Sequence, residues 1–292
     1  MSWRMGMLVV VAMAVSVSAI VQAEVLPLES KVEVPSSQKP PFSRVNSCCG
    51  QEKVEQQARL ITVKVLSSPI SNRDRLLGSG ILVNRQHSTE ESTYRVITNN
   101  HVLQAGEAPY FIETPDGKIH TATSLVAKTQ LQGNDLALLQ FDAGNLDYDV
   151  AQLGEKTSVG DSVIAGGFPL NNSARKSSDG AEFVIKPGQI EWVLDKALEG
   201  GYRIGYTNDV EKGMSGGPVL NCAGGLVGMN GLHAHPNWGD PYIFQDGSHP
   251  TNAERAKMSE YSWAIPMETA IQLFGLEKLT QNPINPHKSD MK

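Results

Sequence analysis

The sequence predicts an all-β protein built as a barrel or a sandwich, and three observations support this prediction. Short apolar or alternating segments recur from about residue 60 to residue 265, separated by turn signals at short intervals. The 27 Gly and 16 Pro residues suit a loop-rich β fold better than a helical bundle. Long helical segments do not alternate with these strands, so a doubly wound parallel sheet is not expected.

The expected strands follow one another along most of the chain. They span residues 60–66, 80–83, 94–98, 110–112, 135–141, 162–166, 190–194, 203–207, 218–220, 226–230 and 262–265. The Gly-Ser-Gly sequence before residue 81 is interpreted as a turn, and Pro115-Asp116-Gly117 as another. The glycine pair after Ala223 predicts a hairpin between two of the last strands.

Helical periodicity is expected in two places only. A short helix is predicted around residues 52–59, before the first strand. A second is predicted from Pro266 to about Phe274, because proline favours the first turn and Met267 and Ile271 share one face.

The N-terminal segment has the pattern of a signal peptide. The apolar stretch 7–21 follows Arg4 and is shorter than the roughly 20 residues that a bilayer span needs. Val21-Gln22-Ala23 then predicts cleavage after Ala23, although an uncleaved anchor is the alternative. The protein is therefore expected to be exported, periplasmic or secreted, with no stable membrane span after removal of the signal.

The cysteine content leaves the disulfide pairing open. Export implies an oxidising compartment, yet the chain has only Cys48, Cys49 and Cys222. Adjacent cysteines are poorly spaced for a bridge, since neighbouring Cα atoms lie about 3.8 Å apart and disulfides need about 4.4–6.8 Å. Either one of the pair bridges to Cys222, or all three are buried thiols.

The charge pattern excludes one class of partner. The chain has 31 Asp+Glu against 25 Lys+Arg, a formal net charge of −6, and no cluster of basic residues. Nucleic-acid binding requires a concentrated basic face, so no nucleic-acid partner is expected.

Three short motifs carry candidate chemistry. His101 follows a predicted strand, Asp135 precedes an apolar strand, and Ser215 lies in the glycine-rich turn Gly213-Met214-Ser215-Gly216-Gly217. Each motif taken alone also fits a structural role, as a cap, an Asx turn or a tight loop. Together they supply a nucleophile, a base and a carboxylate that orients the base. The N–H groups of Gly213 and Ser215 would point at a developing oxyanion.

The three motifs in this order resemble those of the chymotrypsin/trypsin-like serine peptidases. The segment 205–218 is most similar to the small exported trypsin-like peptidases of cyanobacteria, and the resemblance runs from about Leu60 to Phe274. It implies two six-stranded antiparallel β-barrels with a C-terminal helix, polypeptide substrates and no cofactor. It also implies a triad of His101, Asp135 and Ser215 in the cleft between the barrels.

The resemblance sets the expected domain layout. A signal peptide (1–23) and a proline-containing linker (24–54) precede a peptidase domain (55–276), which has barrels at about 55–150 and 151–276. The tail 277–292 is too short for another domain, so the appended PDZ domains of high-temperature-requirement proteases are not expected.

One departure from the family concerns activation. Digestive members carry Asp before the catalytic serine, and this Asp pairs with a newly cut N-terminus. Here the residue is Met214, which cannot pair with an ammonium group. We therefore expect no zymogen switch of that type, and an oxyanion turn that is preformed or ordered by substrate.

Two further segments have alternative interpretations. Asp209 lies six positions before Ser215, where trypsin-like members place a buried carboxylate that selects Arg or Lys; alternatively it is a turn residue facing solvent. The segment 233–261 contains three His and several acidic residues, but it lacks zinc-ligand spacing. A loop that shapes substrate access is expected there, and no metal site.

The predicted function is serine-type endopeptidase activity through an acyl-enzyme. One alternative is a catalytically inactive trypsin-fold interaction module in the periplasm, which the intact set of three residues disfavours. Another is a metal-dependent hydrolase that uses the histidine-rich loop. Neither the natural substrate nor the oligomeric state follows from the sequence.

Overall fold

The computed structural model describes residues 51–67, 75–87, 92–125, 131–170, 181–236 and 239–276. The predicted signal peptide (1–23), most of the predicted linker (24–54) and the tail (277–292) lie outside these ranges. Most of the stretch 170–182, interpreted from its sequence as a surface loop, also lies outside them, as do Cys48 and Cys49.

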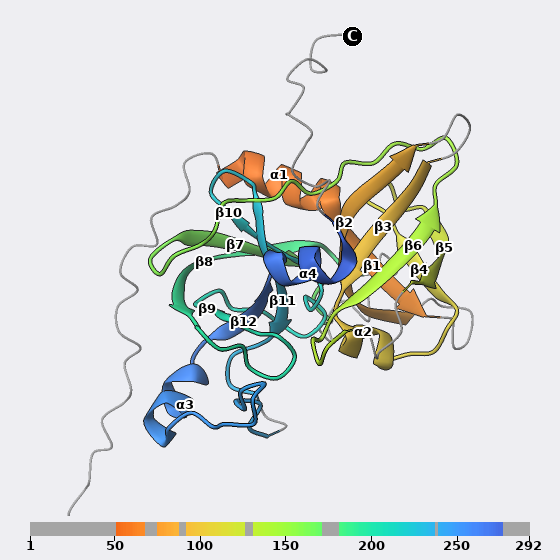
Figure 1. Cartoon of the computed structure of the whole chain (residues 1–292). Coiled ribbons are helices and arrows are strands. Elements are labelled where there is room, and N and C mark those ends of the chain that lie inside the picture. Colours follow the sequence, from red (N-terminus) through yellow and green to blue (C-terminus); the bar gives the residue numbers. More distant parts are fainter. Residues whose placement is uncertain are drawn as a thin grey trace, which may run out of the picture. The chain divides into compact units, whose positions relative to one another are not determined.

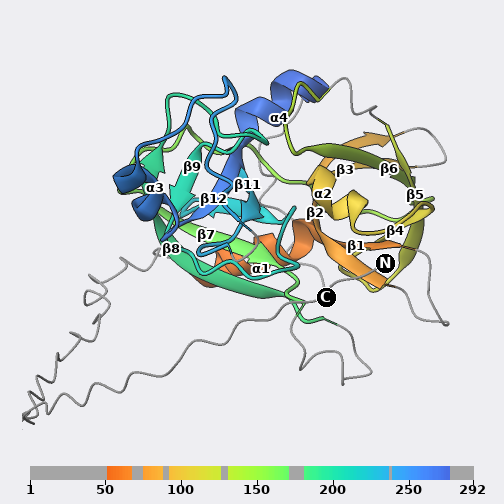
Figure 2. The same cartoon turned by 90° about the horizontal axis from the view of Figure 1, so that it is seen from below.

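The described strands form two closed antiparallel barrels of six strands each, which confirms the predicted fold class. The two barrels lie side by side in both views (Figures 1 and 2). The first barrel has the order β1-β2-β3-β6-β5-β4 and contains β1 (Thr62–Ser67), β2 (Arg75–His87), β3 (Ser92–Thr98), β4 (Tyr110–Glu113), β5 (Ile119–Ser124) and β6 (Ala137–Asp142). The second has the order β10-β11-β12-β9-β8-β7 and contains β7 (Ser162–Gly167), β8 (Val184–Val193), β9 (Ile204–Tyr206), β10 (Pro218–Asn221), β11 (Leu226–Leu232) and β12 (Ser262–Pro266).

Four helices accompany the barrels in the described part of the chain. They are α1 (Gln51–Ile61), α2 (Asn100–Gln104), α3 (Asn252–Met258) and α4 (Met267–Phe274). The predicted helices at 52–59 and 266–274 correspond to α1 and α4, whereas α2 and α3 were not predicted. Because α1 begins at Gln51, the predicted linker boundary at residue 54 falls inside a helix. None of the described helices is long and apolar enough to cross a membrane.

The hydrophobic core has three parts, because alternate residues of a strand face opposite sides. In β3, Val96 faces the interior of the first barrel, and Ile97 faces the layer between the barrels. In β10, Val219 faces the interior of the second barrel, and Leu220 faces the same shared layer. The shared layer packs the two barrels together, and α1 and α4 contribute to it.

The prediction of a turn at Gly78-Ser79-Gly80 is wrong, because these residues lie inside β2. A Cβ at position 80 would lie 2.6 Å from Cγ1 of Val96 on the neighbouring strand, closer than real carbon atoms approach. Gly80 is therefore required by close packing inside the barrel and not by a turn conformation.

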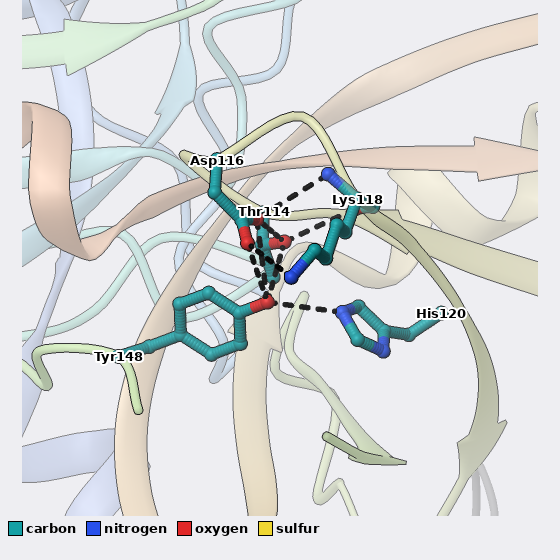
Figure 3. Close-up of polar contacts among 5 residues, drawn as sticks. All are labelled: Thr114, Asp116, Lys118, His120 and Tyr148. Atoms are coloured by element: carbon teal, nitrogen blue, oxygen red, sulfur yellow. Dashed lines mark hydrogen bonds and ion pairs between the residues drawn. The ribbon is translucent and has the colours of Figure 1, made fainter. Parts of the chain in front are cut away.

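A polar cluster anchors the hairpin between β4 and β5 (Figure 3). The Thr114 hydroxyl donates to Oδ1 of Asp116 at 2.6 Å, and the Tyr148 hydroxyl donates to Oδ2 of Asp116 at 3.2 Å. The Tyr148 oxygen also lies 3.2 Å from Oγ1 of Thr114. Nε2 of His120 lies 3.2 Å from the same oxygen, and the His120 ring packs on Phe141 with centroids 4.8 Å apart. These contacts tie the chain after β6 to the turn, which indicates a structural role for the cluster.

Candidate active site

His101 lies on α2, immediately after β3, and two buried polar residues fix this junction. The Thr98 hydroxyl donates to the carbonyl oxygen of Ser79 at 2.7 Å, and the Asn99 side chain donates to the carbonyl oxygen of Asp135 at 3.0 Å. Val102 packs into the first barrel. His101, the residue before Val102, therefore faces outward, and its side chain is 43% exposed.

Asp135 follows a tight turn before β6. Gln132 and Gly133 have φ angles of 50° and 78°, and the backbone N–H of Asp135 donates to the carbonyl oxygen of Gly200 at 2.8 Å. The carboxylate is only 17% exposed. Its Oδ1 accepts the backbone N–H of His101 at 2.8 Å, its Oδ2 lies 2.5 Å from Nδ1 of His101, and it also accepts a hydrogen bond from Tyr202.

The charge of Asp135 is stabilised in place. Burial raises the pKa of this carboxyl, but the hydrogen bonds from His101 and Tyr202 outweigh burial and hold the pKa below its ordinary value. An ionised carboxylate beside Nδ1 favours the tautomer that carries its proton on Nδ1. The geometry therefore leaves Nε2 of His101 able to accept a proton.

Ser215 lies in a turn that requires glycine on both sides. Gly213 has a φ of 98°, and a Cβ there would lie 2.5 Å from the carbonyl oxygen of Phe168. Gly216 has a φ of 84°, and a Cβ there would lie 2.1 Å from the carbonyl oxygen of Ser79. These glycines allow the Ser215 turn of the second barrel to pack closely against β2 of the first barrel.

Two backbone N–H groups of this turn are unused within the described residues. The N–H of Met214 donates to Glu211 at 3.0 Å, and that of Gly216 donates to Asn230 at 2.9 Å. Among the residues that the structure describes, neither Gly213 nor Ser215 donates its backbone N–H to a protein acceptor. The turn therefore offers two N–H groups to a bound anion or a polarised carbonyl.

Ser79, which lies on β2 of the first barrel, holds the Ser215 turn through hydrogen bonds. Its hydroxyl donates to the carbonyl oxygen of Gly213 at 2.8 Å and accepts the N–H of Phe168 at 2.9 Å. Its own N–H donates to the carbonyl oxygen of Ser215 at 2.9 Å. Met214 is fully buried in the second barrel. Buried hydrogen bonds thus hold the turn in a preformed shape, and the residue before Ser215 contributes packing.

The structure joins His101 to Asp135 and places the Ser215 turn close to the helix that carries His101. Gly78 of β2 lies close to both segments: a Cβ at this position would lie 2.8 Å from Cγ2 of Val102, on the helix that carries His101, and 3.1 Å from the carbonyl oxygen of Ser215. The Ser215 hydroxyl itself donates to the carbonyl oxygen of Gly231 at 3.2 Å. No hydrogen bond links this hydroxyl to the His101 ring among the described residues.

A cavity of about 340 Å³ adjoins the Ser215 turn. Its lining comes from the stretch before the turn and from the chain after β11, and consists of Leu170, Asp209, Val210, Glu211, Lys212, His233 and Ala234. Asp209 is exposed at the wall of this cavity. Asn208 is the buried residue, held by the carbonyl oxygens of Val163 and Lys186 at 3.1 and 2.6 Å.

Two acidic residues of the 233–261 segment are engaged with basic side chains. Asp240 pairs with Arg255 at 2.8 Å, and Asp246 pairs with Lys196 at 2.6 Å.

Ser79 and Tyr202 are the two residues at the site that the sequence interpretation missed. The available signals were a lone serine within an apolar strand and a tyrosine directly after the Gly200-Gly201 pair.

The comparisons with known proteins define the class. A family model described as "Trypsin-like peptidase domain" matches residues 78–229, which is more than half of the chain. Together with the two-barrel fold, this match shows that the chain belongs to the trypsin-like peptidase family.

Two curated relatives match the chain at low identity. The chain is 30% identical over 176 residues to "Serine endoprotease DegS" of Haemophilus influenzae, covering 57% of this chain and 45% of that protein. It is 29% identical over 165 residues to "Periplasmic pH-dependent serine endoprotease DegQ" of Escherichia coli, covering 56% and 32%. The chain thus spans less than half the length of these curated relatives.

Solved structures share the fold at low identity. "HtrA-type protease AlgW with decapeptide" matches with a TM-score of 0.54 and 19% identity over 78% of this chain and 67% of that chain. A serine endoprotease from Yersinia pestis matches with a TM-score of 0.52 and 23% identity over 79% of this chain and 66% of that chain.

Proposed function

We propose that the chain is an exported serine endopeptidase that cleaves polypeptides through an acyl-enzyme. Ser215 is the nucleophile, His101 the general base and then the general acid, and Asp135 the residue that orients His101. The observation that carries the proposal is the 2.5 Å contact between Nδ1 of His101 and Oδ2 of Asp135, beside a glycine turn with two unused N–H groups. The names of the curated relatives also support it.

In the proposed reaction, Oγ of Ser215 attacks the carbonyl carbon of the substrate and its proton passes to Nε2 of His101. The carbonyl oxygen becomes an oxyanion bound by the N–H groups of Gly213 and Ser215. His101 then protonates the leaving amine, and water hydrolyses the ester on Ser215. For the first step the Ser215 hydroxyl must leave the Gly231 carbonyl, at the loss of one hydrogen bond of about 1 kcal/mol.

We propose Asp209 as a wall residue of the substrate pocket. Because its side chain is exposed, its attraction for a basic substrate side chain is screened by water and worth about 1 kcal/mol or less. Asp209→Asn is therefore expected to lower a preference for Arg or Lys over neutral residues by about fivefold or less. A loss above about a hundredfold, measured with matched peptide substrates, would show that substrate binding buries this carboxylate.

The disulfide bond formed by Cys222 supports export, because such bonds persist in oxidising compartments. The printed name of the relative from Escherichia coli, which includes the word periplasmic, supports the same location. Fractionation of cells that produce the full chain tests this proposal, and retention in the cytoplasm would contradict it.

A catalytically inactive module of the same fold is the second candidate. The observation that favours it is the orientation of the Ser215 hydroxyl toward Gly231 instead of His101. Hydrolysis of an unfolded protein and of fluorogenic peptides by the wild type, His101→Ala and Ser215→Ala separates the two candidates. We expect Ser215-dependent hydrolysis that persists with a chelator; loss with the chelator would favour a metal-dependent hydrolase.

A further inference from the structure

The carboxylate of Asp135 is held by three hydrogen bonds, and one of them comes from the second barrel. Two of the donors belong to His101, through its backbone N–H at 2.8 Å and Nδ1 at 2.5 Å. The third donor is the hydroxyl of Tyr202, which bonds Oδ2. Tyr202 is therefore the only donor in this described set that is independent of the residue whose ring must exchange a proton.

The loop that carries Tyr202 holds both the backbone and the side chain of Asp135. Gly200 and Gly201 have φ angles of 83° and 86°, a conformation that residues with side chains rarely adopt. The N–H of Leu198 donates to the carbonyl oxygen of Tyr202 at 2.9 Å and closes the loop. The carbonyl oxygen of Gly200 accepts the N–H of Asp135 at 2.8 Å. The loop thus places the phenol against the carboxylate with a fixed geometry.

The ring of Tyr202 occupies space that a side chain at position 231 would need. Tyr202 is only 3% exposed. A Cβ at Gly231 would lie 2.2 Å from Cε1 of the ring and 2.5 Å from its hydroxyl oxygen. The carbonyl oxygen of Gly231 is the acceptor of the Ser215 hydroxyl. The phenol therefore fills the space between Asp135 and the strand that faces Ser215.

The hydroxyl of Tyr202 acts as a neutral donor. Burial, followed by the negative charge of Asp135, raises the pKa of Tyr202 well above its ordinary value. The titratable groups that face the Asp135 carboxylate in the described structure are His101 and Tyr202. Tyr206 is the next neighbour of Tyr202, and its hydroxyl is engaged with Asn230 at 2.8 Å.

We propose that Tyr202 is a positioning residue that fixes the Asp135 carboxylate, so that Asp135 holds the His101 ring in the orientation needed for proton transfer. The inference rests on the proposed function, because it assigns a role within the same reaction. It adds a residue from the second barrel to a pair that otherwise belongs to the first barrel.

Tyr202→Phe tests the proposal, because it removes the hydroxyl and keeps the ring. With a peptide substrate, kcat is expected to fall about tenfold, equivalent to about 1.4 kcal/mol, while KM changes little. The acid limb of the pH profile of kcat/KM is expected to move to higher pH, because Asp135 with one hydrogen bond fewer is a more basic carboxylate and stabilises the protonated form of its partner, the general base, more strongly.

A matched control is Tyr94→Phe in the first barrel. Tyr94 is fully buried and its hydroxyl also donates to an aspartate, Asp147, at 3.3 Å. This variant is expected to lower the melting temperature and leave kcat and the pH profile unchanged. Gly231→Ala is a second probe, since its Cβ displaces the ring without removing the hydroxyl, and it should reproduce the fall in kcat and the shift in pH.

The outcomes separate this inference from the proposed function. If the wild type hydrolyses the substrate no faster than Ser215→Ala, the proposed function is wrong. If the wild type is active through Ser215 but Tyr202→Phe keeps its kcat and its pH profile, the role of Tyr202 is wrong. A rise in KM alone would also overturn the role, because a positioning residue acts on the proton transfer and not on substrate binding.

Discussion

The most informative single substitution outside the three proposed catalytic residues is Ser79→Ala. Its hydroxyl donates to the carbonyl oxygen of Gly213 and accepts the N–H of Phe168, at 2.8 and 2.9 Å. Ser79 is fully buried. The substitution therefore leaves a carbonyl and an N–H without these partners in a site that water does not readily reach.

The magnitude follows from these two bonds. A buried polar group that loses its partner destabilises the fold by about 1–3 kcal/mol. With two such groups, we expect the free energy of unfolding to fall by about 2–6 kcal/mol, which most domains of ordinary stability, about 5–15 kcal/mol, survive. Removing an oxyanion donor outright lowers turnover by about 10²–10³. Because Ser79→Ala only loosens the turn that carries these donors, we expect kcat to fall about 10- to 100-fold with KM little changed.

The assay pairs urea unfolding with steady-state hydrolysis of one fluorogenic peptide. Thr62→Val is the control, because Thr62 is also buried and donates to the carbonyl oxygen of Ala58 at 2.6 Å, away from the Ser215 turn. The control should lose stability and keep kcat. If Ser79→Ala loses stability but keeps the kcat of the wild type, the hydrogen bonds of Ser79 stabilise the fold only and do not support the reaction, which would contradict this prediction.

Three further predictions concern the rest of the molecule. Tyr148→Phe should lower the free energy of unfolding by about 1 kcal/mol in urea titrations at pH 7. Burial raises the pKa of Asp116, but hydrogen bonds from Thr114, Lys118 and Tyr148 outweigh burial and hold the pKa below its ordinary value. The stabilisation by this carboxylate is therefore present above about pH 4 and lost as pH falls through the folded pKa. The stability deficit of Tyr148→Phe should shrink at pH 3, and a deficit that stays constant would contradict this. Met214→Leu should keep the activity within about threefold in hydrolysis assays, because Met214 contributes packing; a loss above a hundredfold would contradict it. Cys222→Ser should destabilise the domain by about 2–5 kcal/mol, read as a lower melting temperature, and a reducing agent should lower that of the wild type but not of the variant.

The strands that pack on both faces were predictable from sequence, whereas the polar strand β5 and the helices α2 and α3 were not. β3 and β10 have apolar residues on both faces, which gives a clear signal. In β5 only Ala122 is buried, so the apolar alternation that marks a strand is missing. The α3 helix had a usable signal, the capping box of Thr251 and Glu254, which the sequence interpretation did not use.

For the site, the sequence indicated the residue types, while long-range contacts supplied the arrangement. The glycines around Ser215 and the acidic residue before β6 are local patterns. The roles of Ser79 and Tyr202 depend on contacts between the two barrels, and no local pattern encodes such contacts. The exposure of Asp209 has a similar cause, because the packing of the neighbouring Asn208 decides which side chain points inward.

Covalent labelling of the full chain with a fluorophosphonate probe, followed by mass spectrometry of the labelled peptide, tests whether Ser215 is an activated nucleophile. We expect one adduct, on Ser215 of the wild type, with labelling greatly slowed in His101→Ala and absent in Ser215→Ala. An unlabelled wild type, or an adduct that persists in Ser215→Ala, would contradict this expectation.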